Sequence, residues 1–295
     1  LGRSEIDRVR TATLAIAEGV GVRGLLNVQF AISAGILYVI EANPRASRTV
    51  PFVSKALGIP LAKAAARIMT GTSIDELKAE GLLPASDGSR VPLDSPVSVK
   101  EAVLPFKRFR TKDGQTVDSV LGPEMRSTGE VMGIDKDFPT AFAKSQAAAY
   151  GGMPLSGTVF ISVADSDKRA VILPAHRLQE LGFSLVATEG TAEILARNGI
   201  KVRVVNKFSE TQTSGEPNIV DLINAGEVDI IVNTPSGRSA RADGYEIRAA
   251  AVAADKALFT TIAVLGAAVS AMDAVREGFS VRSLQEYATD RAGRA

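Results

Sequence analysis

The sequence contains no cysteine and only one histidine, His176. Without cysteine the chain cannot form disulfides, use a thiolate as a nucleophile or bind zinc through sulfur. A single histidine also rules out a metal site built from several imidazoles. These two shortages exclude disulfide-stabilised proteins, thiol-dependent enzymes and multi-histidine metalloproteins.

The chain also lacks a strong charge of either sign and any long apolar run. Its 34 Lys and Arg residues nearly balance 33 Asp and Glu residues, for a net charge of +1. This balance argues against a protein held on nucleic acid or on a membrane surface by bulk charge. No apolar stretch is long enough to span a bilayer, and no signal-peptide pattern is present, so we expect a cytoplasmic location. The chain starts at Leu1 without Met and opens on a helix pattern, from which we expect a fragment of a longer protein.

With 295 residues, the chain is long enough for two domains of ordinary size. Hydrophobic residues at 45% and charged residues at 23% fit a soluble globular protein. The sequence Gly151-Gly152-Met153-Pro154 is the best candidate boundary, because the pattern on its two sides differs. We therefore predict one domain at residues 1–153 and a second at residues 154–295.

Residues 25–48 hold the most informative pattern of the first part. Two apolar-rich runs, Leu25–Ile32 and Ile36–Asn43, flank Ser33-Ala34-Gly35 and predict a β-hairpin with a three-residue loop. A turn centred on Ala34 would pair Gln29 with Val39 and Asn27 with Glu41. One face then carries polar side chains, namely Asn27, Gln29, Glu41 and Asn43. The other is almost wholly apolar, with Leu26, Val28, Phe30, Ile32, Ile36, Tyr38, Ile40 and Ala42.

The polar face offers one carboxylate and several amide oxygens, followed by Arg45 and Arg48. Such oxygen ligands suit Mg²⁺, which takes few protein ligands together with substrate phosphates. Arginine beside such a site suits a phosphoryl or carboxylate oxyanion, because its planar fork matches two acceptors. From the pattern alone, an ordinary amphipathic hairpin with a solvated face is the commoner explanation.

Elsewhere in the first part, Ser4 can cap a helix that runs to about Ala17. Gly19–Gly24 matches G-x-G-x-x-G, but it ends a helix and precedes a strand, so it is not a dinucleotide fingerprint. Proline-rich residues 81–96 indicate a loop. Further elements are expected as helices at Pro60–Met69 and Pro139–Ala149 and strands at Ser98–Phe106 and Gly129–Ile134.

From Leu155 onward, strands alternate with helices, which predicts an α/β fold, a doubly wound parallel sheet with helices on both faces. The expected strands are Thr158–Val163, Ser184–Ala187, Lys201–Val205, Asp229–Asn233 and Ala257–Thr260. The expected helices are Arg169–Leu181, Thr191–Asn198, Ile219–Ala225, Tyr245–Ala254 and Ile262–Arg276.

Ligands of such folds bind beyond the carboxyl ends of the strands. Here those ends carry the segments Thr188–Thr191 and Asn233–Gly237, and Lys168 and Lys207 follow two other strands. Hydroxyls, unpaired N–H groups at a helix start and ammonium groups suit an anion. Simple caps, turns and solvated lysines explain the same residues equally well.

Two motifs carry a resemblance to a known family. Asn27-Val28-Gln29-Phe30 followed by Glu41-Ala42-Asn43-Pro44-Arg45 resembles the metal-binding end of an ATP-grasp domain. The stretch 48–55 and the motif at 122–133, Gly-Pro-Glu-Met-Arg-Ser-Thr-Gly-Glu-Val-Met-Gly, resemble the second ATP-grasp unit of carbamoyl-phosphate synthase large chains. The likeness runs from about Gly24 to the last residue.

The resemblance implies the C-terminal part of an α+β ATP-grasp domain in a ligase. The family makes carbamoyl phosphate from bicarbonate, glutamine-derived ammonia and two ATP, for arginine and pyrimidine biosynthesis. By this likeness Gln29, Glu41 and Asn43 would bind Mg²⁺ or Mn²⁺ and the nucleotide, with K⁺ as a further expected cation. Arg45 and Arg48 would act on the carbamate and phosphate.

The second part resembles a methylglyoxal-synthase-like allosteric domain, which binds nucleotide monophosphates such as UMP or IMP in bacterial members. Pro235 departs from the threonine of many relatives and leaves the effector open. No positioned acid and base accompany His176, so the domain is expected to be regulatory. The matching effector positions are Lys168, Thr188, Thr191, Lys207, Asn233 and Thr234, and an ornithine contact is implied at Glu101 and Thr260.

The family also implies partners: the rest of the large chain, a glutaminase small subunit and a higher oligomer. The ATP-grasp lysine and glycine-rich loop find no room before Leu25, so this chain alone is expected to be inactive in turnover. The alternative is a non-catalytic module that binds a nucleotide monophosphate.

Overall fold

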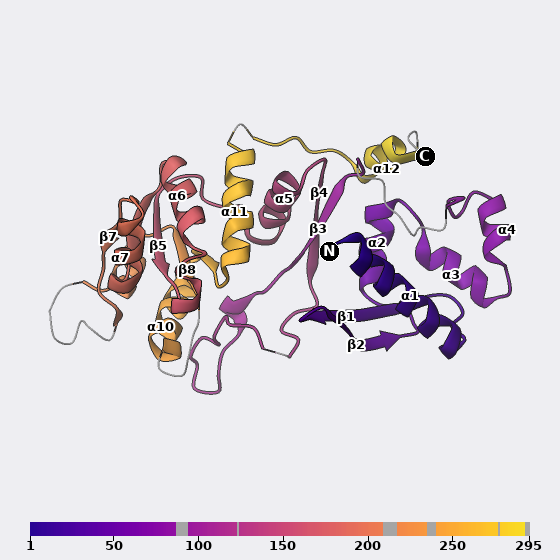
Figure 1. The fold of residues 1–295 in the computed structure, drawn as a ribbon, viewed down its shortest axis with the longest axis horizontal. Helices are drawn as coiled ribbons and strands as arrows, with labels where there is room; N and C mark the ends of the chain where they lie inside the picture. Colours follow the sequence, from indigo (N-terminus) through magenta and orange to yellow (C-terminus); the bar gives the residue numbers. More distant parts are fainter. Residues whose placement is uncertain (87–93, 123, 209–216, 235–239, 277, 293–295) are drawn as a thin grey trace. The chain divides into compact units, whose positions relative to one another are not determined.

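The structure is a computed structural model that describes all residues except 87–93, 123, 209–216, 235–239, 277 and 293–295 (Figure 1). Two compact units are present, one formed by Leu1–Pro96 with Ser280–Ala295 and the other by Val97–Phe279. None of the helices in the described ranges is long and apolar enough to cross a membrane. The predicted boundary between residues 153 and 154 does not coincide with the division into units, and it remains a prediction.

The first unit combines a two-stranded hairpin with five helices among its described residues (Figure 1). The predicted first helix is present as α1, although it begins one residue before Ser4, after Gly2. The elements are α1 (Arg3–Val20), β1 (Asn27–Ser33), β2 (Ile36–Asn43), α2 (Thr49–Leu57), α3 (Leu61–Met69), α4 (Ile74–Ala79) and α12 (Leu284–Ala292).

The hairpin is present, but its predicted register is wrong. Ala34 and Gly35 both have positive φ, 47° and 76°, and they form a two-residue turn between Ser33 and Ile36. Backbone of this kind matches the twist of the strands, so a tight turn replaces the expected three-residue loop. Further along β2 a β-bulge occurs, in which Ile40 is the extra residue without a partner in β1.

Past the bulge, Gln29 pairs with Glu41 and Asn27 pairs with Asn43, instead of the predicted Val39 and Glu41. The shorter turn moves the side chains of β2 by one position relative to β1, and the extra residue of the bulge moves them by one position more. The two shifts cancel, so residues of β2 beyond the bulge face the side that was predicted. The four predicted polar residues therefore still share one face. The predicted apolar face is broken, since Ile36 and Tyr38 pair with Ser33 and Ala31 on the opposite face from Phe30.

Helices α2, α4 and α12 were not predicted from the sequence. Helix α4 begins with a capping box in which Glu76 N–H donates to Ser73 Oγ (3.2 Å) and Ser73 N–H donates to Glu76 Oε2 (2.8 Å). The same reciprocal pattern joins Ser283 and Glu286 before α12. The described part of residues 81–96 contains no helix or strand, as predicted.

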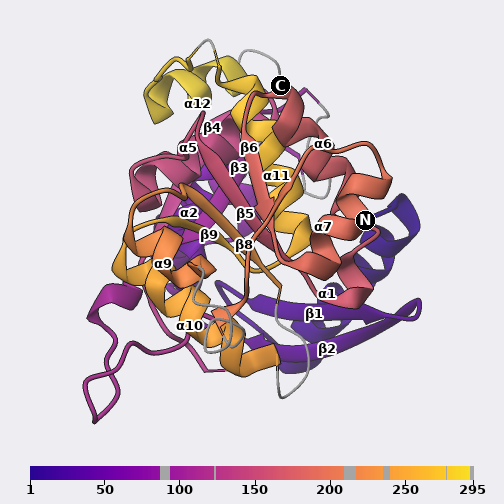
Figure 2. The same ribbon diagram turned by 90° about the vertical axis from the view of Figure 1, so that its left-hand side faces the viewer.

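The second unit contains a five-stranded parallel sheet, which confirms the predicted class (Figure 2). The strand order is β7-β6-β5-β8-β9. Its strands are β5 (Thr158–Ser162), β6 (Ser184–Ala187), β7 (Arg203–Val204), β8 (Ile230–Asn233) and β9 (Ala257–Phe259). The helices that alternate with these strands or follow them are α6 (Ile172–Glu180), α7 (Glu189–Arg197), α9 (Ile219–Asn224), α10 (Ala240–Ala253) and α11 (Ile262–Ala274), and a short 3-10 turn, η2 (Asp165–Asp167), follows β5.

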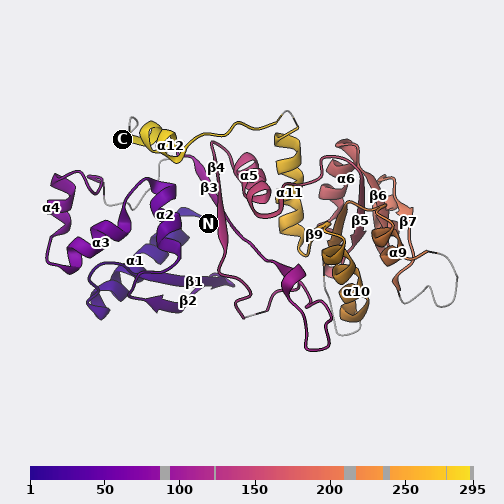
Figure 3. The same ribbon diagram turned by 180° about the vertical axis from the view of Figure 1, so that it is seen from behind.

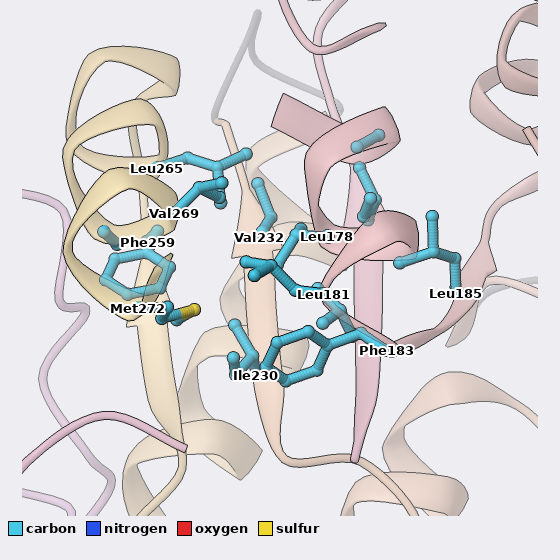
Figure 4. Close-up of a cluster of buried hydrophobic side chains, with 14 of the residues drawn as sticks. Leu178, Leu181, Phe183, Leu185, Ile230, Val232, Phe259, Leu265, Val269 and Met272 are labelled. Carbon is cyan, nitrogen blue, oxygen red and sulfur yellow. The ribbon is translucent and has the colours of Figure 1, made fainter. Parts of the chain in front are cut away.

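Helices cover both faces of this sheet, as a doubly wound fold requires. On one face Leu178, Leu265 and Met272 of α6 and α11 pack against Ile230 and Val232, which Figure 4 shows in close-up. On the other face, side chains of α9 and α10 pack against the alternate residues of the same strands, namely Phe160, Val186 and Ile231. Strands buried on both sides read as continuous apolar runs, which is why their positions were predictable.

An antiparallel pair, β3 (Val97–Ala102) and β4 (Glu130–Asp135), packs with α5 (Phe138–Tyr150) against α11 (Figure 3). The predicted strand 98–106 is shorter in the structure: β3 ends at Ala102, and a 3-10 turn, η1 (Phe106–Arg108), follows Pro105. We call residues 103–129 the β3–β4 connection. This connection contacts α10 and the turn after it. Tyr245 Oη of α10 donates to Thr116 O at 2.7 Å, and Lys107 Nζ lies 2.7 Å from Oδ1 of Asp255 in the turn.

Candidate functional site

The polar face of the β1–β2 hairpin brings together the predicted oxygen ligands. Gln29 lies opposite Glu41 in the ladder, and Asn43 is two residues further along β2 on the same face. Asn43 Nδ2 donates to Glu41 Oε1 at 2.9 Å. Gln29 and Glu41 are exposed, so this face is open to a ligand within the first unit.

Arg45 lies against this face. Its Nη2 donates to Asn43 Oδ1 at 3.4 Å, and its backbone N–H donates to Asn43 O at 2.9 Å in the turn at Pro44. Arg48 lies three residues further on, immediately before the first residue of α2. The structure therefore joins Arg45 to the oxygen ligands by direct contact and places Arg48 at the start of the following helix.

The side chains of this face fit a hard divalent cation. No group of three or more His, Cys, Asp and Glu side chains that could hold a metal ion occurs among the described residues. A site on the hairpin would rely on one carboxylate, amide oxygens, water and phosphate oxygens, which is how Mg²⁺ is commonly held. Asn43 at present turns its amide nitrogen toward Glu41, so binding through Asn43 Oδ1 would require the amide to rotate.

At the carboxyl ends of the parallel strands, hydroxyl groups gather around β5. Thr188 Oγ1 donates to Ser162 Oγ at 3.2 Å, and Thr191 Oγ1 accepts from Val163 N–H at 3.4 Å. Thr234 Oγ1 accepts from Ala164 N–H at 2.8 Å. The three threonines are buried. The structure thus brings three predicted residues together, and it adds Ser162, which sequence reasoning missed.

Lys168 supplies positive charge beside these hydroxyls. A Cβ placed on Gly190 would lie 3.2 Å from Lys168 Nζ, so the ammonium group sits against the first turn of α7. The start of a helix is itself electropositive, so the two positive groups together favour an anion. Asp165 Oδ1 lies 2.7 Å from the same Nζ, and the hydrogen bond from Lys168 lowers the pKa of Asp165. Lys207 follows β7 and is half-buried.

Asn233 ends β8 and belongs to a buried polar network that the sequence did not predict. Arg248 of α10 is fully buried, and its Nη1 donates to Asn233 Oδ1 at 2.7 Å. Its Nε and Nη2 donate to the two carboxylate oxygens of Asp118 at 2.7 and 2.6 Å. Burial raises the pKa of Asp118, but hydrogen bonds from Arg248 and Val120 outweigh it and leave the pKa below its usual value. Asp118 and Arg248 are 130 residues apart, so no local pattern points to the pair.

Glu101, an implied ornithine contact, lies on β3, where Gln146 Nε2 of α5 donates to its Oε2 at 2.9 Å. Burial raises the pKa of Glu101. It also raises the pKa of Tyr150 to about 12, and Tyr150 Oη donates to Ala102 O at 2.8 Å. Thr260 follows β9 and immediately precedes Thr261, the cap of α11. Both positions thus adjoin elements that pack on α5.

His176 is exposed, and its Nδ1 lies 3.4 Å from Glu180 Oε1, so it has a carboxylate neighbour one turn away that sequence reasoning overlooked. Pro235–Gly237, part of the predicted anion loop, lies outside the described residues.

Comparison with known proteins connects both sites to one family. Residues 1–77 match the family model "Carbamoyl-phosphate synthase L chain, ATP binding domain", and residues 170–260 match the "MGS-like domain" model. The chain is 75% identical over 295 residues to the carbamoyl phosphate synthase large chain of Clavibacter michiganensis subsp. michiganensis, covering all of this chain and 27% of that protein. It is 68% identical to the large chain of Kineococcus radiotolerans over 295 residues, covering 97% of this chain and 27% of that protein.

A third relative, the large chain of Streptomyces coelicolor, is 62% identical over 291 residues, covering 98% of this chain and 26% of that protein. The chain thus spans about a quarter of the length of the curated relatives it matches. The similarity includes the hairpin in the first matched region and most of the parallel sheet in the second. The chain belongs to the carbamoyl phosphate synthase large chain family.

Proposed function

We propose that this chain provides the metal- and phosphate-binding end of the site at which carbamate is phosphorylated by ATP. The observation that carries the proposal is the polar face of the hairpin, where Glu41, Gln29 and Asn43 lie together and Arg45 contacts Asn43. This face lies inside the region that matches the ATP-binding family model. The whole ligase would use bicarbonate, glutamine-derived ammonia and two ATP, with a glutaminase partner.

Each residue has a distinct part in this proposal. Gln29, Glu41 and Asn43 would hold Mg²⁺ or Mn²⁺ against the ATP phosphates, and the bound ion would supply charge neutralisation. Arg45 presents a planar fork to an oxyanion such as the carbamate or the transferred phosphate, and Arg48 adds a second guanidinium nearby. The protein's contribution is positioning and electrostatics, which suits phosphoryl transfer because little covalent work is needed.

Replacing Glu41 in the full-length large chain tests this proposal. Glu41→Gln keeps size and hydrogen bonding but removes the only carboxylate among the three proposed ligands. ATP synthesis from ADP and carbamoyl phosphate should fall by about a hundredfold or more. Glu193→Gln, which alters an exposed carboxylate paired with Arg197, is the matched control and should leave the rate unchanged. A near-normal rate in Glu41→Gln would refute the assignment.

The second unit favours an additional role as a regulatory module that binds a nucleotide monophosphate. The supporting observation is the convergence of buried threonine hydroxyls, the first turn of α7 and Lys168 Nζ at the carboxyl end of β5. The cluster suits a phosphate group. Lys207, which follows β7, would add charge toward the same ligand.

Thermal unfolding of the chain with UMP or IMP tests the regulatory role. A ligand that binds only the folded state stabilises it by about 2.7 kcal/mol at a hundredfold excess over its dissociation constant. The melting temperature should rise accordingly, and Lys168→Ala should lose most of the increase. Lys201→Ala, at an exposed residue before β7, is the control. No shift and no heat of binding with either nucleotide would exclude this role.

A further inference from the structure

We propose that Arg248 is a positioning residue that fixes Asn233 as a hydrogen-bond donor at the strand ends, so that the site selects ligands presenting an acceptor. The inference deepens the regulatory role and rests on it. It assigns a task to a buried arginine in α10 and names the ligand chemistry that Asn233 recognises.

The orientation of the Asn233 amide follows from the chemistry of its neighbour. Arginine carries only donors and stays charged in proteins, so the atom that Arg248 Nη1 approaches at 2.7 Å must be the amide oxygen. An isolated amide could be turned either way, because its oxygen and nitrogen are alike in shape. Beside Arg248 only one orientation is favourable, and it directs the NH₂ group away from the guanidinium.

Arg248 is itself held in place from two sides. Asp118 accepts from its Nε and Nη2, which is the two-point geometry that orients a guanidinium firmly. Gly244, one turn earlier on α10, leaves the necessary space. A Cβ at position 244 would come within 2.5 Å of Arg248 Nη1 and 3.1 Å of Asn233 Oδ1. The third guanidinium nitrogen is therefore aimed at Asn233 by its surroundings.

As a consequence, the side chain of Asn233 at the end of β8 presents a hydrogen-bond donor and not an acceptor. Asn233 Oδ1 already accepts a hydrogen bond from Arg248, and Asn233 Nδ2 donates none to another residue in the described part of the chain. The side chain therefore offers a donor to a ligand in this site, and a donor recognises a phosphate or a carbonyl oxygen. With Lys168 against the start of α7, the ligand class is an anion carrying such an acceptor.

The first experiment measures binding to this chain by calorimetry with UMP, uridine and inorganic phosphate as separate probes. Asn233→Asp keeps the shape and an oxygen for Arg248 but replaces the donor by an acceptor. UMP should bind about tenfold more weakly or worse. Asn198→Asp, at an exposed asparagine whose Nδ2 donates to Ile194 O at 2.8 Å, controls for the added charge and should bind as the wild type does.

The three probes locate the acceptor. If Asn233 faces the phosphate, the loss will appear with UMP and phosphate but not with uridine. If Asn233 faces a base carbonyl, the loss will appear with UMP and uridine but not with phosphate. Unchanged binding of every probe that the wild type binds would overturn the proposal.

The second experiment separates positioning from general stability. Gly244→Ala retains every polar group but pushes the guanidinium away from Asn233. In ¹⁵N-asparagine-labelled chain, the side-chain NH₂ signals of Asn233 should be sharp in the wild type and broadened or shifted in Gly244→Ala. Gly266→Ala is the control, because a Cβ there meets nothing within 4 Å.

The side-chain NH₂ signals of Asn233 also separate failure of this proposal from failure of the regulatory role. If the wild type binds none of the probes, the regulatory role falls, and the NMR result still decides whether Arg248 orients Asn233. Asn233 signals that are identical in the wild type and Gly244→Ala would show that Arg248 does not fix the amide. If Gly244→Ala does not fold, Arg248→Lys is measured instead, with the same signals expected to broaden.

Discussion

Gln29 and Glu41 lie directly opposite each other in the antiparallel ladder of β1 and β2. Their side chains therefore leave the hairpin on the same face, close enough for a single ligand to contact both. Asn43 reaches Glu41 Oε1 from two residues along the same strand, at 2.9 Å. This arrangement places three oxygen-bearing side chains on one face of a short hairpin, beside its bulge at Ile40, and it is the basis of the proposed metal site.

Replacing Arg45 by lysine should damage the full-length ligase although the charge is kept. Lysine is a point charge and cannot reproduce the planar two-point contact of a guanidinium with an oxyanion. We expect the rate of carbamoyl phosphate synthesis to fall by about tenfold or more. Arg197→Lys, at an exposed arginine paired with Glu193, should have no effect. Full activity of Arg45→Lys would show that Arg45 is not an oxyanion clamp.

Gly133, the glycine of β4, should not tolerate replacement by alanine. A Cβ there would lie 1.9 Å from Ala141 O and 2.6 Å from Ser145 N, both backbone atoms of α5. Gly133→Ala should therefore force α5 away from the strand and cost about 3 kcal/mol or more in the free energy of unfolding, measured with urea. Gly266→Ala in α11 meets no atom and should be neutral or stabilising by up to about 1 kcal/mol. Equal stabilities of the two variants would contradict the close packing of α5 on β4.

The ion pair of Asp118 and Arg248 should make stability sensitive to acid. Asp118→Asn leaves the buried guanidinium without its counter-charge and should cost about 2 kcal/mol at neutral pH, less than a fully buried pair because Asp118 is one-third exposed. The folded-state pKa of Asp118 is lowered from 3.8, so its contribution is present above that pH and is lost as the pH falls through the folded-state pKa. The stability difference between wild type and variant should thus shrink below about pH 4. A difference that stays constant from pH 7 to pH 2 would show that the carboxylate charge is not responsible.

Glu101 should show the opposite pH dependence. Burial raises its pKa above 4.5 in the folded chain, so the folded state holds the proton more tightly than the unfolded state. Stability should therefore decrease as the pH rises from 4.5 through the raised pKa. Glu101→Gln keeps the contact with Gln146 without this cost and should be more stable at pH 7 by about 0.5 kcal/mol, a small gain because Glu101 is only partly buried. An unchanged pH profile in Glu101→Gln would rule out this source of the effect.

The parallel sheet could be predicted because its strands are buried on both faces and stand as apolar runs between helices. The predicted strand at Ser184–Ala187 coincides with β6, and the predicted helix at Ile219–Ala225 differs from α9 by one residue. Element ends were less predictable. Helix α10 begins at Ala240 rather than Tyr245, and β7 contains only Arg203 and Val204. These limits depend on packing and hydrogen bonding that a local pattern does not contain.

The polar face of the hairpin was predicted for a reason that was partly wrong. The sequence indicated a turn of three residues, whereas Ala34 adopts a positive φ that non-glycine residues rarely take. The bulge at Ile40 restores the alternation by a feature that only pairing reveals. The burial of Arg248 could not be predicted from the sequence, because a buried arginine needs a partner of opposite charge. That partner, Asp118, lies in the β3–β4 connection, 130 residues away.

The position of the bound metal tests the central claim most directly. In the full-length large chain with ADP, Fe²⁺ can replace the divalent ion, and ascorbate with peroxide then cleaves the backbone next to the bound iron. The account predicts cleavage within residues 41–45, together with loss of this cleavage in Glu41→Gln and its retention in Glu193→Gln. Cleavage confined to other segments, or cleavage at residues 41–45 that survives Glu41→Gln, would contradict the assignment of the hairpin as the metal- and phosphate-binding face.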